Sequence, residues 1–171
     1  MQVRFDEIPA EGLRLEIRDA AWFPVGDFEP SGPVGAELFL ERRDNRVFVQ
    51  GRLEGRVRLV CDRCLVSYEF GLDHDFAIDA ELMDPETLRF EKAEHACDQS
   101  EMDVLFLATP AIDVGEVLAQ EVFFSLPAKR ICSEACQGLC PRCGANLNKE
   151  RCACGDAEAS SPFAALKQLK H

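Results

Sequence analysis

The sequence predicts an α+β fold: an antiparallel β-meander sheet with a covering helix and a C-terminal cysteine-rich zinc module. Three observations favour it. Apolar and polar residues alternate through residues 36–79, an apolar stripe of helical spacing follows near residue 114, and cysteines crowd residues 132–154. The 171 residues are 47% hydrophobic and 29% charged, as in globular proteins. We expect a sheet domain at residues 1–126 and the cysteine-rich module at residues 127–171.

The predicted sheet begins with a hairpin. Ala36, Leu38 and Leu40 are apolar at every second position, a second alternating run covers residues 47–59, and Asp44 with Asn45 favours the turn between them. A third run continues from residue 66 to residue 78, with aspartates and other polar residues on its opposite face. Such alternation is typical of antiparallel strands with one buried face.

Two helices are predicted after an acidic surface loop at residues 84–103, which has no periodicity. The first covers the sheet over about residues 114–124. Asp113 followed by Glu116 has the character of a capping box, and Pro127 ends the helix. Its buried side is formed by Val114, Val117, Leu118 and Val122. The second starts at Ser161 and Pro162, and we interpret it as a helix that only packs.

Nine cysteines are the strongest chemical signal. An odd number, in a chain that starts without signal-peptide features, favours metal-bound thiolates in a reducing cytoplasm over a disulfide framework. Cys140 and Cys143 flank a knuckle turn that ends in Gly144, and Cys152 and Cys154 follow after eight intervening residues. Four sulfurs at this spacing favour Zn²⁺, and a rubredoxin-like iron centre is the lesser alternative.

Two cysteine pairs remain, and together they would form a second zinc site. Cys61 and Cys64 lie where one predicted strand ends, and Cys132 and Cys136 precede the knuckle. The alternative grouping combines the four cysteines at 132, 136, 140 and 143 and leaves Cys61 and Cys64 to the last pair. We therefore predict one or two zinc ions and interpret Cys97, in the acidic loop, as an incidental thiol. The predicted metal ligands are Cys61, Cys64, Cys132, Cys136, Cys140, Cys143, Cys152 and Cys154.

Charge is unevenly distributed along the chain. The formal net charge of -12 argues against bulk attraction to nucleic acid, but fifteen acids against two bases between residues 67 and 125 account for the whole deficit. Basic side chains gather on the second strand and in the cysteine-rich module, where a shared metal would join them into one RNA-binding patch. Each Zn(Cys)₄ centre carries about -2 and weakens that positive field. The predicted phosphate contacts are Arg52, Arg56, Arg58, Arg63, Lys129, Arg130, Arg142, Lys149 and Arg151.

The sequence contains no strong motif for catalysis or for membrane insertion. The three histidines are scattered, there is no glycine-rich phosphate loop, and the Cys61 turn lacks the βαβ context of a thioredoxin-like centre. No apolar run approaches the roughly 18 residues of a membrane span. We expect a noncatalytic, cytoplasmic protein without membrane contact.

Several motifs resemble the YceD family, the large ribosomal RNA subunit accumulation proteins of bacteria and plastids. They are CDRC, LPAKRIC, GLCPRCGANLN, a C-x-C pair and the closing SPFAALKQLK, within about residues 35–170. The resemblance implies a noncatalytic factor for accumulation of large-subunit (23S) rRNA and ribosome assembly, which binds rRNA or a pre-ribosomal particle. All eight predicted metal ligands match the family's two cysteine motifs.

Two alternative functions stay open. The acidic segment 67–125 would suit docking of a basic ribosomal protein, with no RNA contact. A thiol redox protein would instead need a thiolate of low pKa at Cys61 or Cys140.

Overall fold

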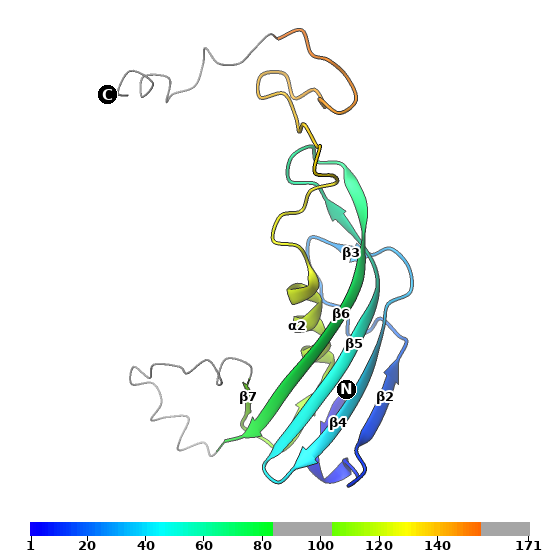
Figure 1. Ribbon diagram of the computed structural model, residues 1–171, viewed down its shortest axis with the longest axis vertical. Helices are drawn as coiled ribbons and strands as arrows, with labels where there is room; N and C mark the ends of the chain where they lie inside the picture. The colour runs from blue at the N-terminus through cyan, green and yellow to red at the C-terminus, as the bar shows by residue number, and fades with distance from the viewer. Residues whose placement is uncertain (84–103, 155–171) are drawn as a thin grey trace, which may run out of the picture. The chain divides into compact units, whose positions relative to one another are not determined.

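The computed structural model describes residues 1–83 and 104–154 (Figure 1). Contacts define two compact units: residues 1–58 with 69–127, and residues 59–68 with the chain from residue 128 on. The predicted acidic loop with Cys97, and the predicted C-terminal helix, lie outside the described residues. Within the described part, no helix has the length and apolar character that crossing a bilayer requires.

The first unit is built on a six-stranded sheet. Its strands are β2 (Leu13–Ile17), β3 (Glu29–Pro30), β4 (Gly35–Arg43), β5 (Arg46–Val60), β6 (Ser67–Leu82) and β7 (Val104–Leu107). The main order is β2-β4-β5-β6-β7, and β3 also pairs with β5. The pairs β2–β4, β3–β5 and β4–β5 are antiparallel.

The sheet departs from the predicted antiparallel meander at one edge. Strand β7 runs parallel to β6, with Asp79 opposite Val104 and Leu82 opposite Leu107. Parallel neighbours need a long connection, which the chain between residues 83 and 104 provides. A separate two-stranded antiparallel sheet of β1 (Gln2–Arg4) and β8 (Ala111–Asp113) was also not predicted. A 3₁₀ turn, η1 (Phe5–Glu7), follows β1.

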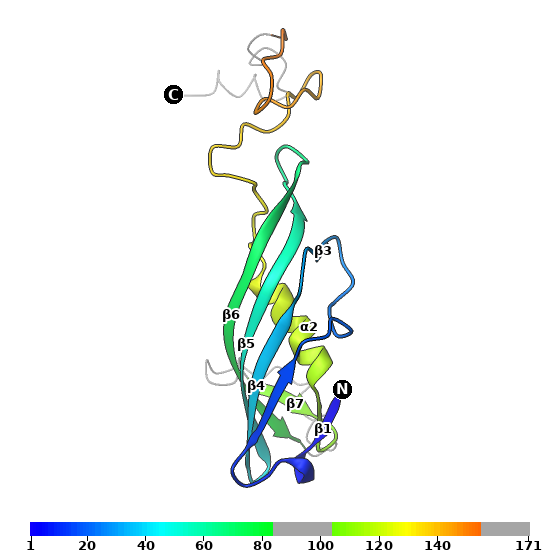
Figure 2. The same ribbon diagram turned by 90° about the vertical axis from the view of Figure 1, so that its right-hand side faces the viewer.

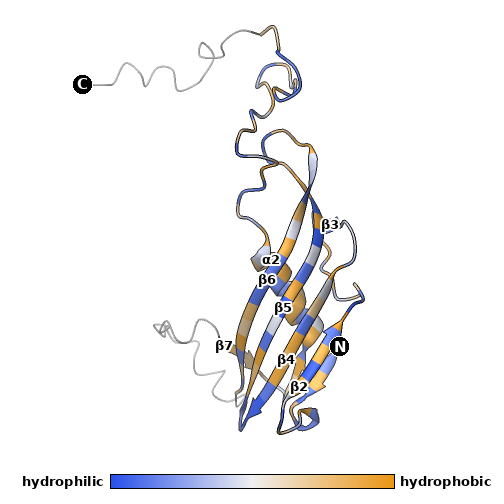
Figure 3. Cartoon of the chain, turned by 45° about the vertical axis from the view of Figure 1, so that its right-hand side comes forward, coloured by the Kyte–Doolittle hydropathy of each residue, from blue (hydrophilic) through white to orange (hydrophobic). Residues whose placement is uncertain are grey.

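The predicted hairpin is confirmed as β4 and β5. Arg43 pairs with Arg46 across the turn, and Asp44 adopts a φ of 52°, a left-handed conformation that aspartate tolerates. Apolar and polar residues alternate visibly along both strands (Figure 3). The buried face consists of Ala36, Leu38, Leu40, Val47, Val49, Leu53, Val57 and Leu59, each at most 4% exposed. A slip of one residue would expose this whole face, so the alternation fixes the register.

Helix α2 (Val114–Ser125) covers one face of the sheet, as predicted (Figures 1 and 2). The Asp113 carboxylate caps its N-terminus by accepting hydrogen bonds from the backbone N–H groups of Gly115 (2.9 Å) and Glu116 (3.3 Å). The predicted apolar side is buried: Val114, Val117, Leu118 and Val122 are at most 3% exposed. Burial of this stripe holds the helix against the sheet.

One polar pair joins α2 to the sheet and was not predicted. Glu121 is buried on the core side of the helix, and its carboxylate lies 2.9 Å from His74 Nε2 on β6. The signal in the sequence is that His74 has the same parity as the apolar positions of β6. Because a buried carboxylate needs a hydrogen-bond partner, His74 allows Glu121 to occupy a core position.

The polar face of the sheet is lined with ion pairs between strands. Arg46 contacts Asp79 (3.1 Å) and also Glu81. Arg52 contacts Asp73 (2.7 Å) and Arg58 contacts Glu29 (2.7 Å). Exposed pairs of this kind contribute little to folding, because water and salt screen them. They matter here because they occupy arginines that a ligand would otherwise use.

Candidate metal centres

Eight cysteines gather in two groups of four, all in the second unit. The first group is Cys61, Cys64, Cys132 and Cys136, and the second is Cys140, Cys143, Cys152 and Cys154. Within each group all four sulfurs lie within 4.8 Å of one another. The structure thus forms the grouping that the sequence favoured, and not the alternative one.

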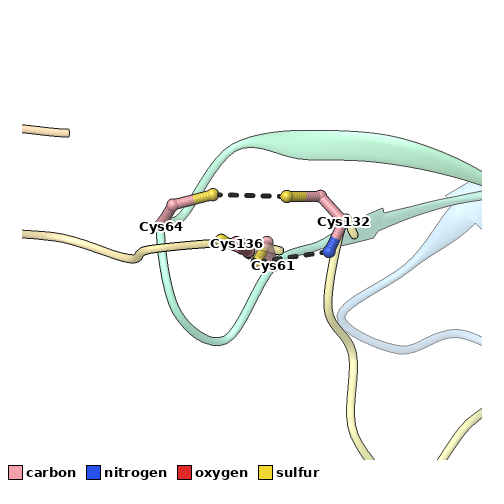
Figure 4. A group of neighbouring side chains, drawn as sticks. All are labelled: Cys61, Cys64, Cys132 and Cys136. Carbon is pink, nitrogen blue, oxygen red and sulfur yellow. Dashed lines mark hydrogen bonds between the residues drawn. The ribbon is translucent and has the colours of Figure 1, made fainter. Parts of the chain in front are cut away.

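The first group has the dimensions of a tetrahedral metal site. A regular tetrahedron with metal–sulfur distances of about 2.3 Å separates its sulfurs by about 3.8 Å. The distance between the sulfurs of Cys61 and Cys136 is 3.8 Å, and that between Cys64 and Cys132 is 3.6 Å (Figure 4). A disulfide requires about 2 Å. These spacings fit four thiolates around one ion.

The tip of the β5–β6 hairpin forms the first knuckle. The backbone N–H of Leu65 donates to the Cys61 carbonyl (2.9 Å), and the N–H of Cys61 donates to the Val66 carbonyl (3.0 Å). Leu65 takes a left-handed φ of 57° and is exposed. This tight turn brings both thiols of the C-x-x-C pair to one side of the chain.

The segment after residue 128 forms hydrogen bonds with two residues of that knuckle, Asp62 and Cys61. The N–H of Asp62 donates to the Arg130 carbonyl (2.7 Å), and the N–H of Arg130 donates to the Asp62 carboxylate (2.9 Å). The N–H of Cys132 donates to the Cys61 sulfur (3.4 Å; Figure 4). The cysteines of this group form a small core with the partly buried Val66, Tyr68, Ile131 and Leu139. The first group therefore takes the place of a hydrophobic core in this unit.

The second group repeats the same knuckle. The N–H of Gly144 donates to the Cys140 carbonyl (2.9 Å), and the N–H of Cys140 donates to the Ala145 carbonyl (2.8 Å). Gly144 has a φ of 73°, the left-handed conformation that glycine adopts without steric cost. The turn is the counterpart of the one at Leu65. Cys140 is buried, whereas Cys143 is exposed, so this group is the more open of the two.

Both knuckles carry an arginine with the same role. Arg63 donates to the Cys136 carbonyl (3.0 Å), and Arg142 donates to the Cys154 carbonyl (3.1 Å). In each group the knuckle arginine thus bonds to the last cysteine of its own group. The shared pattern C-x-R-C was readable in the sequence, but both arginines were assigned to phosphate contacts only.

Asn148 is a site residue that the sequence reasoning missed. Its side-chain N–H donates to the Cys136 sulfur (3.4 Å), and its side-chain oxygen accepts from the backbone N–H of Gln137 (2.7 Å). Metal-bound thiolates commonly accept such outer hydrogen bonds. The only signal in the sequence is an asparagine between two cysteine pairs.

The thiols of each group differ in pKa. Burial acts to raise the pKa of Cys61, but the backbone N–H groups of Cys132, Cys64 and Arg63 lower it to about 6. The N–H groups of Cys143 and Arg142 likewise lower the pKa of Cys140 to about 6. Burial and the neighbouring thiols raise the pKa of Cys132 to about 12. The Cys143 side chain, with burial, raises the pKa of Cys154 to about 12.

Metal binding is expected to release protons and to weaken in acid. At pH 7 the thiols of Cys132 and Cys154 still carry protons, so loading each group releases at least one proton. As the pH falls through about 6, Cys61 and Cys140 also become protonated and affinity falls further. Zinc titration calorimetry in buffers of different ionisation enthalpy measures the released protons. Affinity that stays constant from pH 8 to pH 5 would contradict thiolate ligation.

The predicted phosphate contacts differ in whether they already form ion pairs within the protein. Arg52 and Arg58 pair with carboxylates of the first unit, whereas Arg56 forms no ion pair with any residue in 1–83 or 104–154. In the second unit, Lys129, Lys149 and Arg151 are exposed and likewise form no ion pair with a described residue. Arg130 is partly buried. Accessible cations of the set therefore occur in both units, because Arg56 of β5 is also exposed.

Fold and site together define a class: a sheet protein that carries a cysteine-rich unit with two four-sulfur groups able to hold metal ions. The family described as "Large ribosomal RNA subunit accumulation protein YceD" matches residues 49–170, and the chain belongs to this family. The match covers both cysteine groups.

A curated relative is similar over a shorter segment. The "Large ribosomal RNA subunit accumulation protein YCED homolog 1, chloroplastic" of Arabidopsis thaliana is 37% identical over 59 residues, which is 34% of this chain. That segment spans only 18% of the relative's length. No solved structure matches the chain.

Proposed function

We propose that the chain is a noncatalytic, cytoplasmic factor that supports accumulation of large-subunit rRNA by binding that RNA or an assembly intermediate. Membership of the YceD family and the name of the plant relative support the process. The observation that supports RNA contact is the location of unpaired cations. Arg46, Arg52 and Arg58 of β5 already pair with carboxylates of the first unit, whereas Lys129, Lys149 and Arg151 of the second unit are exposed and form no ion pair with a described residue, which leaves them available to phosphate.

The proposed cofactor is Zn²⁺, one ion in each cysteine group. Four thiolates at tetrahedral spacing are the usual ligands of structural zinc, and closed sites of this kind stabilise small domains. The ions would fix the loops that carry the cations. They would not attract RNA themselves, since each Zn(Cys)₄ centre carries about -2. Binding must then come from individual phosphate contacts and not from a broad positive field.

The other two functions receive less support. Docking of a basic protein through the acidic segment 67–125 is less favoured on β6, where Asp73, Asp75 and Asp79 already contact arginines of β5. A redox thiol must be reachable by its substrate, and both candidates of low pKa are buried: Cys61 is 0% and Cys140 6% exposed. A low thiol pKa suits a metal ligand equally well.

Salt dependence tests the proposed function. Binding to a transcript of the large-subunit rRNA should weaken about 20- to 40-fold between 50 and 200 mM salt, as expected for about three phosphate contacts. Filter binding or fluorescence anisotropy with the zinc-loaded chain measures this. If affinity is indifferent to salt, or if the chain binds a basic ribosomal protein and no RNA, the proposal fails.

A further inference from the structure

The loop that closes the second cysteine group also reaches the first one. Asn148 lies between Cys143 and Cys152, yet its side chain donates to the sulfur of Cys136 (3.4 Å), a member of the first group. The Gln137 N–H donates to the Asn148 side-chain oxygen (2.7 Å). A backbone N–H can only donate, so the oxygen must face Gln137 and the NH₂ must face the sulfur. The orientation of this amide is thereby determined.

The same loop is attached to the first group by its backbone. The N–H of Leu147 donates to the Gly138 carbonyl (3.0 Å), and Leu139 forms an antiparallel bridge with Asn146. The N–H of Leu139 donates in turn to the carbonyl of Arg63 in the first knuckle (3.1 Å). A continuous set of hydrogen bonds therefore runs from the loop of the second group to the knuckle of the first.

Closing this loop has a cost in conformational entropy. With no metal on the second group, the eight residues between Cys143 and Cys152 must be ordered before Asn148 can reach Cys136. A metal on the second group fixes both ends of the loop in advance. The first group would then receive its outer hydrogen bond without that cost.

We propose that the two metal sites bind cooperatively and that Asn148 is the positioning residue that couples them. This rests on the proposed metal binding. Filling either site raises the affinity of the other by the same factor, because coupling between binding sites is reciprocal. We expect a factor of about 10 or more, within the usual range for such coupling and for the loss of an outer hydrogen bond.

Zinc titrations of the full chain against a competing chelator test the proposal. Cys143→Ser isolates the first site and Cys61→Ser isolates the second. The overall constant for loading both sites of the wild-type chain should exceed the product of the two single-site constants about 10-fold or more. Asn148→Ala should bring this ratio close to one, while both sites still load.

Two further variants separate positioning from folding. Asn148→Asp keeps an acceptor for Gln137 but removes the donor to sulfur, so it should also lose the coupling. Gln137→Ala changes an exposed side chain and leaves its backbone N–H in place, so it should keep the coupling. In the cadmium-loaded chain, the NMR signal of the first site should shift in Asn148→Ala and not in Gln137→Ala.

The outcomes are distinguishable. A wild-type constant equal to the product of the single-site constants would overturn the coupling and leave two independent metal sites. Equal coupling in wild type and Asn148→Ala would overturn the role of Asn148. A chain that binds no zinc at all would overturn the metal sites of the proposed function, and the coupling with them.

Discussion

A chain carrying Cys61→Ser is expected to bind one metal ion, against two expected for the wild type, and to lose the fixed structure around Cys132 and Cys136. The sulfur of Cys61 is fully buried and also accepts the N–H of Cys132. Structural zinc sites contribute on the order of 10 kcal/mol to the folding of small units, so loss of one ligand here outweighs any single side-chain contact. Elemental analysis gives the metal per chain, and amide NMR reports the local structure.

Matched cysteine variants make this result specific. Cys143→Ser should also remove one ion, but should disturb less structure because Cys143 is exposed. Cys97→Ser should remove none, since we interpret that thiol as incidental. A wild-type chain that is metal-free yet has an ordered second unit would refute the assignment of both groups.

Reversing three cations of the cysteine-rich unit is expected to abolish most RNA binding. Lys129→Glu, Lys149→Glu and Arg151→Glu together should lower the affinity for large-subunit rRNA about 100-fold or more and reduce the slope of log affinity against log salt by about two to three. Neither lysine nor Arg151 pairs with a carboxylate of the described residues, so their substitution breaks no ion pair there. The reversal replaces phosphate contacts by repulsion.

A triple variant in the first unit is the control. Arg14→Glu, Arg18→Glu and Arg43→Glu change the formal charge by the same amount at exposed positions. Arg18 and Arg43 already pair with Glu16 and Glu41, and the Arg14 guanidinium lies 5.2 Å from the centroid of the Phe39 ring. This variant should bind RNA within about threefold of wild type. If the two triple variants lose equal affinity, the contact depends on net charge and not on the cysteine-rich unit.

The part of the fold that follows local periodicity was predictable. The β4–β5 hairpin and helix α2 each repeat their apolar residues at the period of the element, and Asp113 marks the helix start. Strand β7 is only the apolar run Val104–Leu107, which has no alternation to reveal its partner or direction. Its parallel pairing with β6 therefore cannot be predicted from the local pattern of the sequence.

The candidate site was likewise predictable only in part. The identity of the metal-ligand candidates was readable from cysteine spacing. Charge along the sequence, however, does not show which residues of neighbouring strands lie side by side, so the arginines of β5 and the aspartates of β6 form two separate charge patterns in the sequence. The sheet places them side by side, with Arg52 against Asp73 and Asp75. Asn148 was not predicted, because its part in the site is a hydrogen bond to the Cys136 sulfur, and residue spacing does not reveal such a bond.

The first cysteine group draws its members from two stretches of chain, with Cys64 and Cys132 separated by 68 positions. During synthesis the early pair is therefore made well before its partners. At about 5 to 20 residues per second, this interval lasts about 3 to 14 s. During this interval the hairpin tip of the nascent chain carries only two of the four thiols that the first group needs. A fragment beginning at residue 128 would lack this pair permanently and could complete only the second group.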